Sequence, residues 1–179
     1  MKRLILFFFL GVNFYSFSSK GYNITPIELT EKIITINQLI FDNDLEHYNK
    51  LIIGTISAET LYGKYRGNSP LGIAQISPDG WRFIKSRITE EDIAILKIVG
   101  YENIEFKDLA NDPVLSLFFC SLYYKYKLNG NVPKNIEEYA ITWKKYYNTS
   151  AGAGTVEDFK TKYFKHGEKH LKNFKISIE

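Results

Sequence analysis

Cysteine is almost absent from this 179-residue sequence, which contains only Cys120, so no intramolecular disulfide can form. A fold without disulfides depends on its hydrophobic core, and a content of 45% hydrophobic residues is sufficient for one domain of this length. Cys120 lies in the apolar run 117–122, where a thiol is expected to be a small buried hydrophobe. The three histidines are distant from it in the sequence, so no base for a cysteine nucleophile is indicated.

An excess of either charge is also lacking. Lys and Arg number 23 and Asp and Glu number 20, and the net charge of +3 does not indicate a nucleic-acid partner. Basic residues gather only near the C-terminus, where a solvated helix face is the preferred interpretation and contact with an anionic polymer or membrane is the alternative. These residues are Lys160, Lys162, Lys165, Lys169, Lys172 and Lys175.

Metal-binding patterns are missing as well. His166 and His170 are four residues apart, but Glu168 between them is not placed as in a zinc-binding His-Glu-x-x-His motif. We interpret both histidines as exposed and expect neither a metal nor a cofactor.

The N-terminus has the pattern of a secretory signal peptide. Two basic residues precede the apolar run 4–14, and Ser16 and Ser18 place small residues at the two positions that a signal peptidase inspects. The apolar run is short for a membrane span. We expect residues 1–18 to be removed, which leaves residues 19–179 as one periplasmic or secreted domain. An N-terminal anchor that is not cleaved is the alternative.

Helix caps and apolar spacing predict a mostly helical domain, without repeats, a Pro-rich linker or a series of alternating strands. Thr25, Thr89 and Thr155 each precede an acidic residue by three positions, and Asp112 precedes a proline, so each marks a helix start. Gly63 is the predicted cap at the end of the second helix. The predicted helices cover residues 26–41, 45–61, 79–87, 113–128 and 135 to 146 or 147, and two more begin after Thr89 and Thr155.

Two segments of small and polar residues interrupt the helices. The first, residues 62–78, follows the helix that carries Glu59, and the second, residues 148–154, follows Tyr147. The turns before Glu59 are apolar, and no basic residue follows it before Lys64. Loss of solvation should therefore raise the pKa of its carboxyl, as a general acid near neutral pH requires. A solvent-facing Glu in the last turn of a helix is the alternative interpretation.

These elements, in this order, resemble the lysozyme-like lytic transglycosylases of the soluble-lytic-transglycosylase type. Members of that family have a catalytic Glu at a helix end, then a Ser, a Gly-x-x-Gln element, and later a Tyr-Asn pair before a glycine-containing turn. The likeness covers about residues 51–164, with Thr60 in place of the usual Ser, Ala74 in place of the common Met, and a shorter loop. The matching residues are Glu59, Ser69, Gly72, Gln75, Tyr147, Asn148 and Gly152.

The resemblance implies a mostly α, single-domain lysozyme-like fold, with or without a minimal β-hairpin after the catalytic helix. It implies that Glu59 acts as both acid and base and cleaves the β-1,4 bond between N-acetylmuramic acid (MurNAc) and N-acetylglucosamine (GlcNAc) in peptidoglycan, leaving 1,6-anhydro-MurNAc ends. Tyr147 would hydrogen-bond near Glu59 or the sugar and hold the acid in place. Substrate contacts would come from Ser69, Gln75, Tyr147 and Asn148, while Gly72, Gly152 and Gly154 would be structural. Candidate sugar platforms are Trp81, Trp143, Tyr62, Tyr65 and Tyr146.

Three alternatives follow from the same residues. A hydrolytic muramidase would need a second carboxylate, and Asp79 is the nearest acid after Glu59. A catalytically silent envelope protein would use the fold to bind glycan only, and the Lys-rich C-terminus suggests a membrane-active helix. For the preferred interpretation we expect a monomer that binds peptidoglycan glycan strands, with at most a weak contact between its Lys-rich C-terminus and the envelope surface.

Overall fold

The computed structural model of the protein describes residues 21–66, 70–150 and 152–178. The expected signal peptide, residues 1–18, and the candidate site residue Ser69 lie outside the described residues. The described chain is mostly helical, as the sequence predicts. None of its helices combines the length and the apolar character that crossing a membrane would need.

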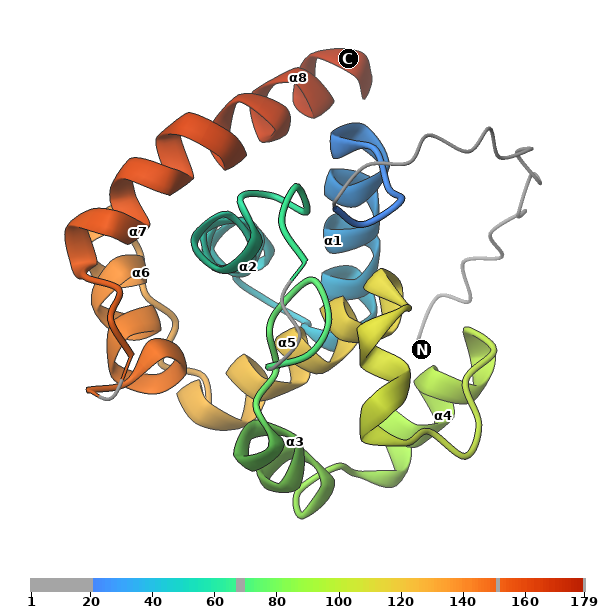
Figure 1. Ribbon diagram of the computed structural model, residues 1–179. Helices are drawn as coiled ribbons and strands as arrows, with labels where there is room; N and C mark the ends of the chain where they lie inside the picture. Colours follow the sequence, from blue (N-terminus) through green and yellow to red (C-terminus); the bar gives the residue numbers. More distant parts are fainter. Residues whose placement is uncertain (1–20, 67–69, 151, 179) are drawn as a thin grey trace.

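One buried helix, α2 (Leu45–Thr60), lies at the centre of the larger group of helices (Figure 1). Residues 51–58 are buried all around this helix, which is the pattern of a helix enclosed by others. Glu59 follows this buried stretch directly and is only partly buried. The elements that contact α2 are α1 (Pro26–Ile40), α5 (Pro113–Leu128), α6 (Ile136–Thr142), α7 (Val156–Lys162), η3 (Tyr163–Gly167) and α8 (Glu168–Ile178).

A smaller group of helices lies on the other side of α5 (Figure 1). It consists of α3 (Pro78–Lys85), α4 (Glu90–Ile98) and the 3-10 turn η1 (Phe106–Ala110). Both α3 and η1 contact α5, so this long helix joins the two groups. The chain between α2 and α3 passes from the larger group to the smaller one. Among the described residues, its β-type backbone pairing is limited to one antiparallel bridge, between Leu71 and Ile76. The minimal hairpin that the resemblance allows is thus reduced to one bridge.

Local signals set the helix starts. Reciprocal capping boxes are present at Thr25, Thr89 and Thr155, and the Asp112 carboxylate accepts a hydrogen bond from the Leu115 N–H at 2.9 Å. All four predicted starts are confirmed, because a cap acts within three residues of chain and needs no tertiary contact.

The predicted range of α2, residues 45–61, is correct to within one residue, but its cap is Leu61 and not Gly63. The helix stops at Thr60, and Leu61 and Tyr62 already have left-handed backbones, with φ of 52° and 61°. That conformation costs about 1–2 kcal/mol for each residue that is not glycine. The Tyr62 ring is buried, and its hydroxyl shares a 2.7 Å hydrogen bond with Thr30 of α1. Gly63 is left-handed as well, with φ of 82°, so the glycine belongs to the turn. Packing of Tyr62 accounts for the start of the turn two residues before the glycine.

The helix predicted from Asn135 changes type before it ends. After α6 the chain continues as a π-helical segment, η2 (Trp143–Asn148). A second π-helical segment, η3 (Tyr163–Gly167), joins α7 to α8. Such segments are rare and frequently occur at functional sites, and η2 contains Tyr147 and Asn148 of the candidate site.

Glycines allow α7 and η3 to pack closely on α2. A Cβ atom on Gly54 would lie 2.2 Å from Cζ of the Phe159 ring, and Phe159 is fully buried. A Cβ atom on Gly167 would lie 2.6 Å from Cγ2 of Ile53 and from Oγ of Ser57. Side chains at these two positions would force the helices apart.

We predict that Gly54→Ala lowers the free energy of unfolding by about 1–3 kcal/mol, the usual cost of overpacking a core. Helix propensity alone would favour Ala by about 1 kcal/mol, so the sign of the change reports the packing. Urea unfolding measures it. In a Phe159→Leu background the same substitution should cost less, because Leu lacks the ring atoms nearest Gly54. A gain in stability on the wild-type background would contradict this account.

Candidate active site

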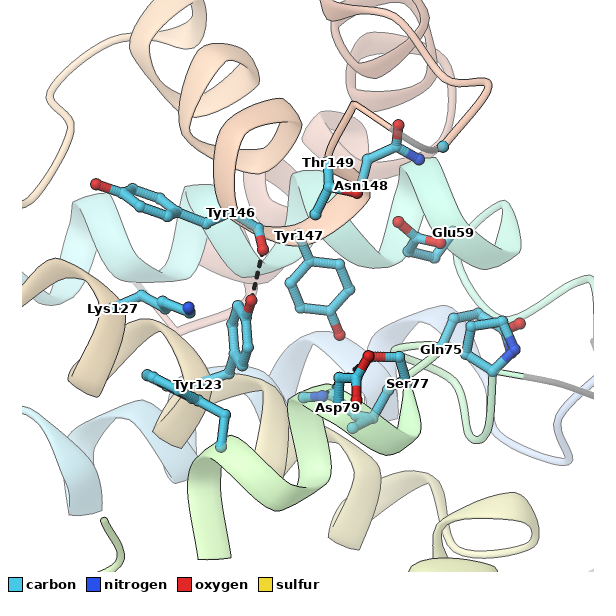
Figure 2. A pocket seen from close by; sticks show the side chains of 15 residues that line it. Glu59, Gln75, Ser77, Asp79, Tyr123, Lys127, Tyr146, Tyr147, Asn148 and Thr149 are labelled. Carbon is cyan, nitrogen blue, oxygen red and sulfur yellow. Dashed lines mark hydrogen bonds between the residues drawn. The ribbon is translucent and has the colours of Figure 1, made fainter. Parts of the chain in front are cut away.

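A pocket of about 660 Å³ opens where α2, α3, α5 and η2 meet (Figure 2). Its walls bring together residues that are far apart in the sequence: Glu59 of α2 lines one part, and η2 with the loop after it lines another. Five residues of the candidate site lie in this lining: Glu59, Gln75, Tyr147, Asn148 and Gly152.

Glu59 lies at the pocket wall and is the last residue but one of α2. Burial raises the pKa of its carboxyl to about 7, although two neighbours act in the opposite direction. The indole Nε1–H of Trp143 donates to Glu59 Oε1 at 2.9 Å, and the positive charge of Lys162 also favours the ionised carboxylate. The carboxyl can therefore both hold and release a proton near neutral pH.

Trp143 is a support for Glu59 and not a sugar platform, so that part of the sequence interpretation is wrong. Only 2% of the residue is exposed, and its ring packs against Phe159 with centroids 5.4 Å apart. Gly154 makes room for the indole, because a Cβ atom there would lie 2.6 Å from Trp143 Cη2. A tryptophan 84 residues away from an acid carries no sequence signal that would predict this bond.

Lys162 also acts on Glu59, and the sequence did not single it out for the site. It belongs to α7, and its Nζ donates to the carbonyl oxygen of Ala58 at 3.0 Å. This bond holds the ammonium next to the residue that carries the acid. Because Lys162 is not part of the pocket lining, its positive charge acts on Glu59 from outside the pocket.

Tyr147 lines the pocket, but the structure does not pair it with Glu59. Its hydroxyl donates to the carbonyl oxygen of Ala74 at 2.5 Å, next to Gln75. Its ring stacks on Tyr124, with centroids 5.6 Å apart, and meets Tyr123 edge-on at 5.3 Å. Tyr147 thus joins η2 to the loop that follows α2, while the hydrogen bond expected of it is supplied by Trp143.

Gln75 sits in a tight turn of that loop. Its backbone is left-handed, with φ of 51°, and its side-chain Nε2 donates to the carbonyl oxygen of Gly72 at 2.7 Å. Gly72 has φ of 79°, and a Cβ atom there would lie 2.3 Å from Oγ of Ser116 in α5. The same Ser116 hydroxyl oxygen accepts from the backbone N–H of Ala74 at 3.1 Å. The turn is therefore pinned to α5 where it meets the pocket.

Asn148 and Gly152 are held together by Lys144. The Lys144 ammonium donates to Asn148 Oδ1 and to the carbonyl oxygen of Gly152, both at 2.8 Å. A Cβ atom on Gly152 would lie 2.4 Å from the carbonyl oxygen of Asn148, so this position has no room for a side chain. The three residues fix the shape of the pocket rim between η2 and α7.

Of the other candidate platforms, only Tyr146 lines the pocket. Tyr62 is 3% exposed, so it is not a sugar platform. Its ring stacks on His170 with centroids 5.1 Å apart, and both His170 and His166 are partly buried, so the interpretation of the two histidines as exposed is wrong. Trp81 is partly buried and stacks on Phe119 at 4.5 Å. Tyr65 is 57% exposed but lies outside the pocket lining.

Two further side chains bear on the chemistry. Asp79 lines the pocket, but its side chain is 88% exposed and forms an ion pair with Arg82. Cys120 is fully buried, and burial raises the pKa of its thiol to about 12, as expected of a cysteine that serves the core. Of the two carboxyls in the pocket lining, Glu59 is thus shielded from water and Asp79 is exposed to it.

We predict that Glu59→Gln stabilises the fold at alkaline pH. The folded protein keeps Glu59 protonated up to a pKa of about 7, so wild-type stability falls as the pH rises from the ordinary Glu value of 4.5. Gln has no such loss, and its advantage should reach up to about 3 kcal/mol at pH 8 and disappear at pH 4. Urea unfolding at both pH values measures the difference. Glu102→Gln, at an exposed position, is the control, and an equal effect of the two substitutions at pH 8 would contradict the burial of Glu59.

Comparison with known proteins assigns no family to the chain: no protein-family model, no curated protein and no solved structure matches it. Its function is therefore inferred from the residues of the pocket and from the order of the motifs along the sequence.

Proposed function

We propose that this protein is an exported peptidoglycan lytic transglycosylase in which Glu59 is the single general acid and base. The observation that carries the proposal is a partly buried carboxyl with a pKa of about 7 at the wall of a pocket of about 660 Å³. The volume lies within the range of about 300–1,000 Å³ that is typical of ligand sites. Tyr146 in the lining offers a ring face of the kind that binds sugars. The buried Tyr123 forms the wall beside it, and its hydroxyl donates to the carbonyl oxygen of Tyr146 at 2.5 Å (Figure 2).

In the proposed reaction, protonated Glu59 first donates its proton to the oxygen that links MurNAc to GlcNAc. The bond between C1 of MurNAc and this oxygen breaks, the electron pair stays on the oxygen, and GlcNAc leaves as the free 4-hydroxyl. The Glu59 carboxylate then takes the proton of the MurNAc C6 hydroxyl, while the oxygen of that hydroxyl bonds to C1 of the same sugar. This closure within one sugar needs no water and regenerates the protonated acid.

Trp143 and Lys162 would act between these two proton transfers. After the first transfer Glu59 is a carboxylate, and the indole N–H donates a charge-assisted hydrogen bond to it. Burial favours the neutral acid before the transfer, and these two groups limit the cost of the anion after it. The opposing effects keep the pKa near the pH at which both steps must proceed.

Glu59 and Asp79, the two carboxyls of the pocket lining, differ in their exposure to water. This difference supports a mechanism in which Glu59 alone is catalytic. A second catalytic carboxylate would act as a nucleophile or would activate water. Asp79 is exposed and paired with Arg82, in contrast to Glu59. Because Asp79 nevertheless lines the same pocket, a hydrolytic muramidase is the second candidate function.

Purified peptidoglycan should yield fragments that end in 1,6-anhydro-MurNAc, as measured by mass spectrometry. Glu59→Gln should lower the rate by about 10²–10⁴-fold, the usual contribution of general acid catalysis. The matched control is Asp79→Asn, which should retain most of the activity. Reducing ends, together with loss of activity in Asp79→Asn, would replace the proposal with the hydrolase. Glycan binding without cleavage would indicate a silent glycan-binding protein.

The pH profile tests the role of Trp143. The rate kcat/KM should fall as the pH rises through about 7, because the acid then loses its proton. Trp143→Phe removes the donor to the carboxylate, so the pKa of Glu59 should rise and the alkaline limb should move to higher pH, with a lower maximal rate. Trp81→Phe, away from the pocket, should leave the limb in place. An unmoved limb in a folded Trp143→Phe variant would show that the bond does not tune the acid.

A further inference from the structure

The pocket carries a positive charge at the side opposite Glu59. Lys127, near the end of α5, lines this side together with Tyr123 and Tyr146 (Figure 2). The lysine side chain is partly buried and reaches toward the two tyrosines. None of the steps proposed for Glu59 uses this charge.

The surroundings of Lys127 are aromatic and positive. Its Nζ lies 4.0 Å from the centroid of the Phe83 ring and 5.5 Å from that of Tyr123. The guanidinium of Arg87 also lies over Phe83, with Cζ 4.1 Å from the centroid. Ring faces attract a cation but leave its net charge in place. Lys127 lines the pocket and Arg87 lies outside its lining, so the ammonium of Lys127 is the charge that makes this side of the pocket attractive to an anion.

Lys127 forms no ion pair within the part of the chain that the structure describes, unlike Lys125 on the same helix. Lys125, two positions earlier on α5, pairs with buried Asp92 at 2.6 Å. Asp79, the second carboxylate in the pocket lining, is engaged with Arg82. The ammonium of Lys127 is thus available to a ligand in the pocket.

We propose that Lys127 binds a carboxylate on the side chain of a MurNAc residue, an inference that rests on the proposed action on peptidoglycan. MurNAc carries a lactyl group, which ends either in a free carboxylate or in a peptide with carboxylates of its own, and GlcNAc carries neither. An ammonium in a partly buried pocket distinguishes a charged side chain from a neutral one. Because the two sugars alternate along the strand, a MurNAc held at Lys127 also fixes which bond faces Glu59.

Binding to an inactive protein tests this role without the reaction. All proteins carry Glu59→Gln, and the probes are a GlcNAc–MurNAc tetrasaccharide with its peptides, the same glycan after amidase treatment, and neutral chitotetraose. Adding Lys127→Met should weaken binding of at least one carboxylate-bearing glycan by about tenfold, and the loss should shrink as salt is raised. Chitotetraose binding should not change. The matched control is Lys97→Met, an exposed lysine outside the pocket lining, which should alter no affinity more than about twofold.

The pattern across the probes identifies the carboxylate. A loss confined to the peptide-bearing glycan assigns the contact to the peptide, and a loss that includes the amidase-treated glycan assigns it to the lactyl group. Equal losses on all three probes, or none on either charged glycan, would overturn the inference. If the Glu59→Gln protein binds none of the three, the proposed function itself fails. If it binds all of them and Lys127→Met has no effect, the role of Lys127 alone is refuted.

Discussion

The hydrogen bond from the Trp143 indole to the Glu59 carboxyl is the contact on which the site depends. Burial at the end of α2 shields the Glu59 carboxyl from water, and this desolvation alone would keep the carboxyl protonated and neutral. The indole N–H, helped by the charge of Lys162, makes the ionised form accessible again. A carboxyl that is balanced in this way can exchange a proton near neutral pH, which neither a fully solvated nor an unsupported buried carboxyl could do.

Much of the surrounding fold serves to bring these two residues together. Gly54 lets α7 approach α2, and the same Phe159 ring that fills this contact packs on Trp143. Gly154 leaves the space that the far edge of the indole occupies. Within η2, Trp143 reaches α2, while Tyr147 reaches the carbonyl of Ala74 in the loop that follows α2. One π-helical turn therefore supports the acid and joins two walls of the pocket.

The parts of this arrangement that the sequence predicts are the local ones. Helix starts followed from capping residues, and the perturbed acid followed from the apolar turns before Glu59, because both effects operate within a few residues. The partner of the acid could not be predicted, since an indole is equally suited to a sugar face and to a buried hydrogen bond. The end of α2 was predicted to within one residue, but its cap was not, because the left-handed turn begins at Leu61 and Tyr62, where Tyr62 is buried in a distant core contact, ahead of the glycine.

The most direct measurement is an NMR titration of the carboxyl carbon of Glu59 in the intact protein, with the signal assigned by its loss in the Gln variant. A midpoint near pH 7 is predicted, because the carboxyl is shielded from water and supported by the Trp143 indole. A midpoint near 4.5, the ordinary value for Glu, would show a solvated carboxylate and would contradict its role as the acid.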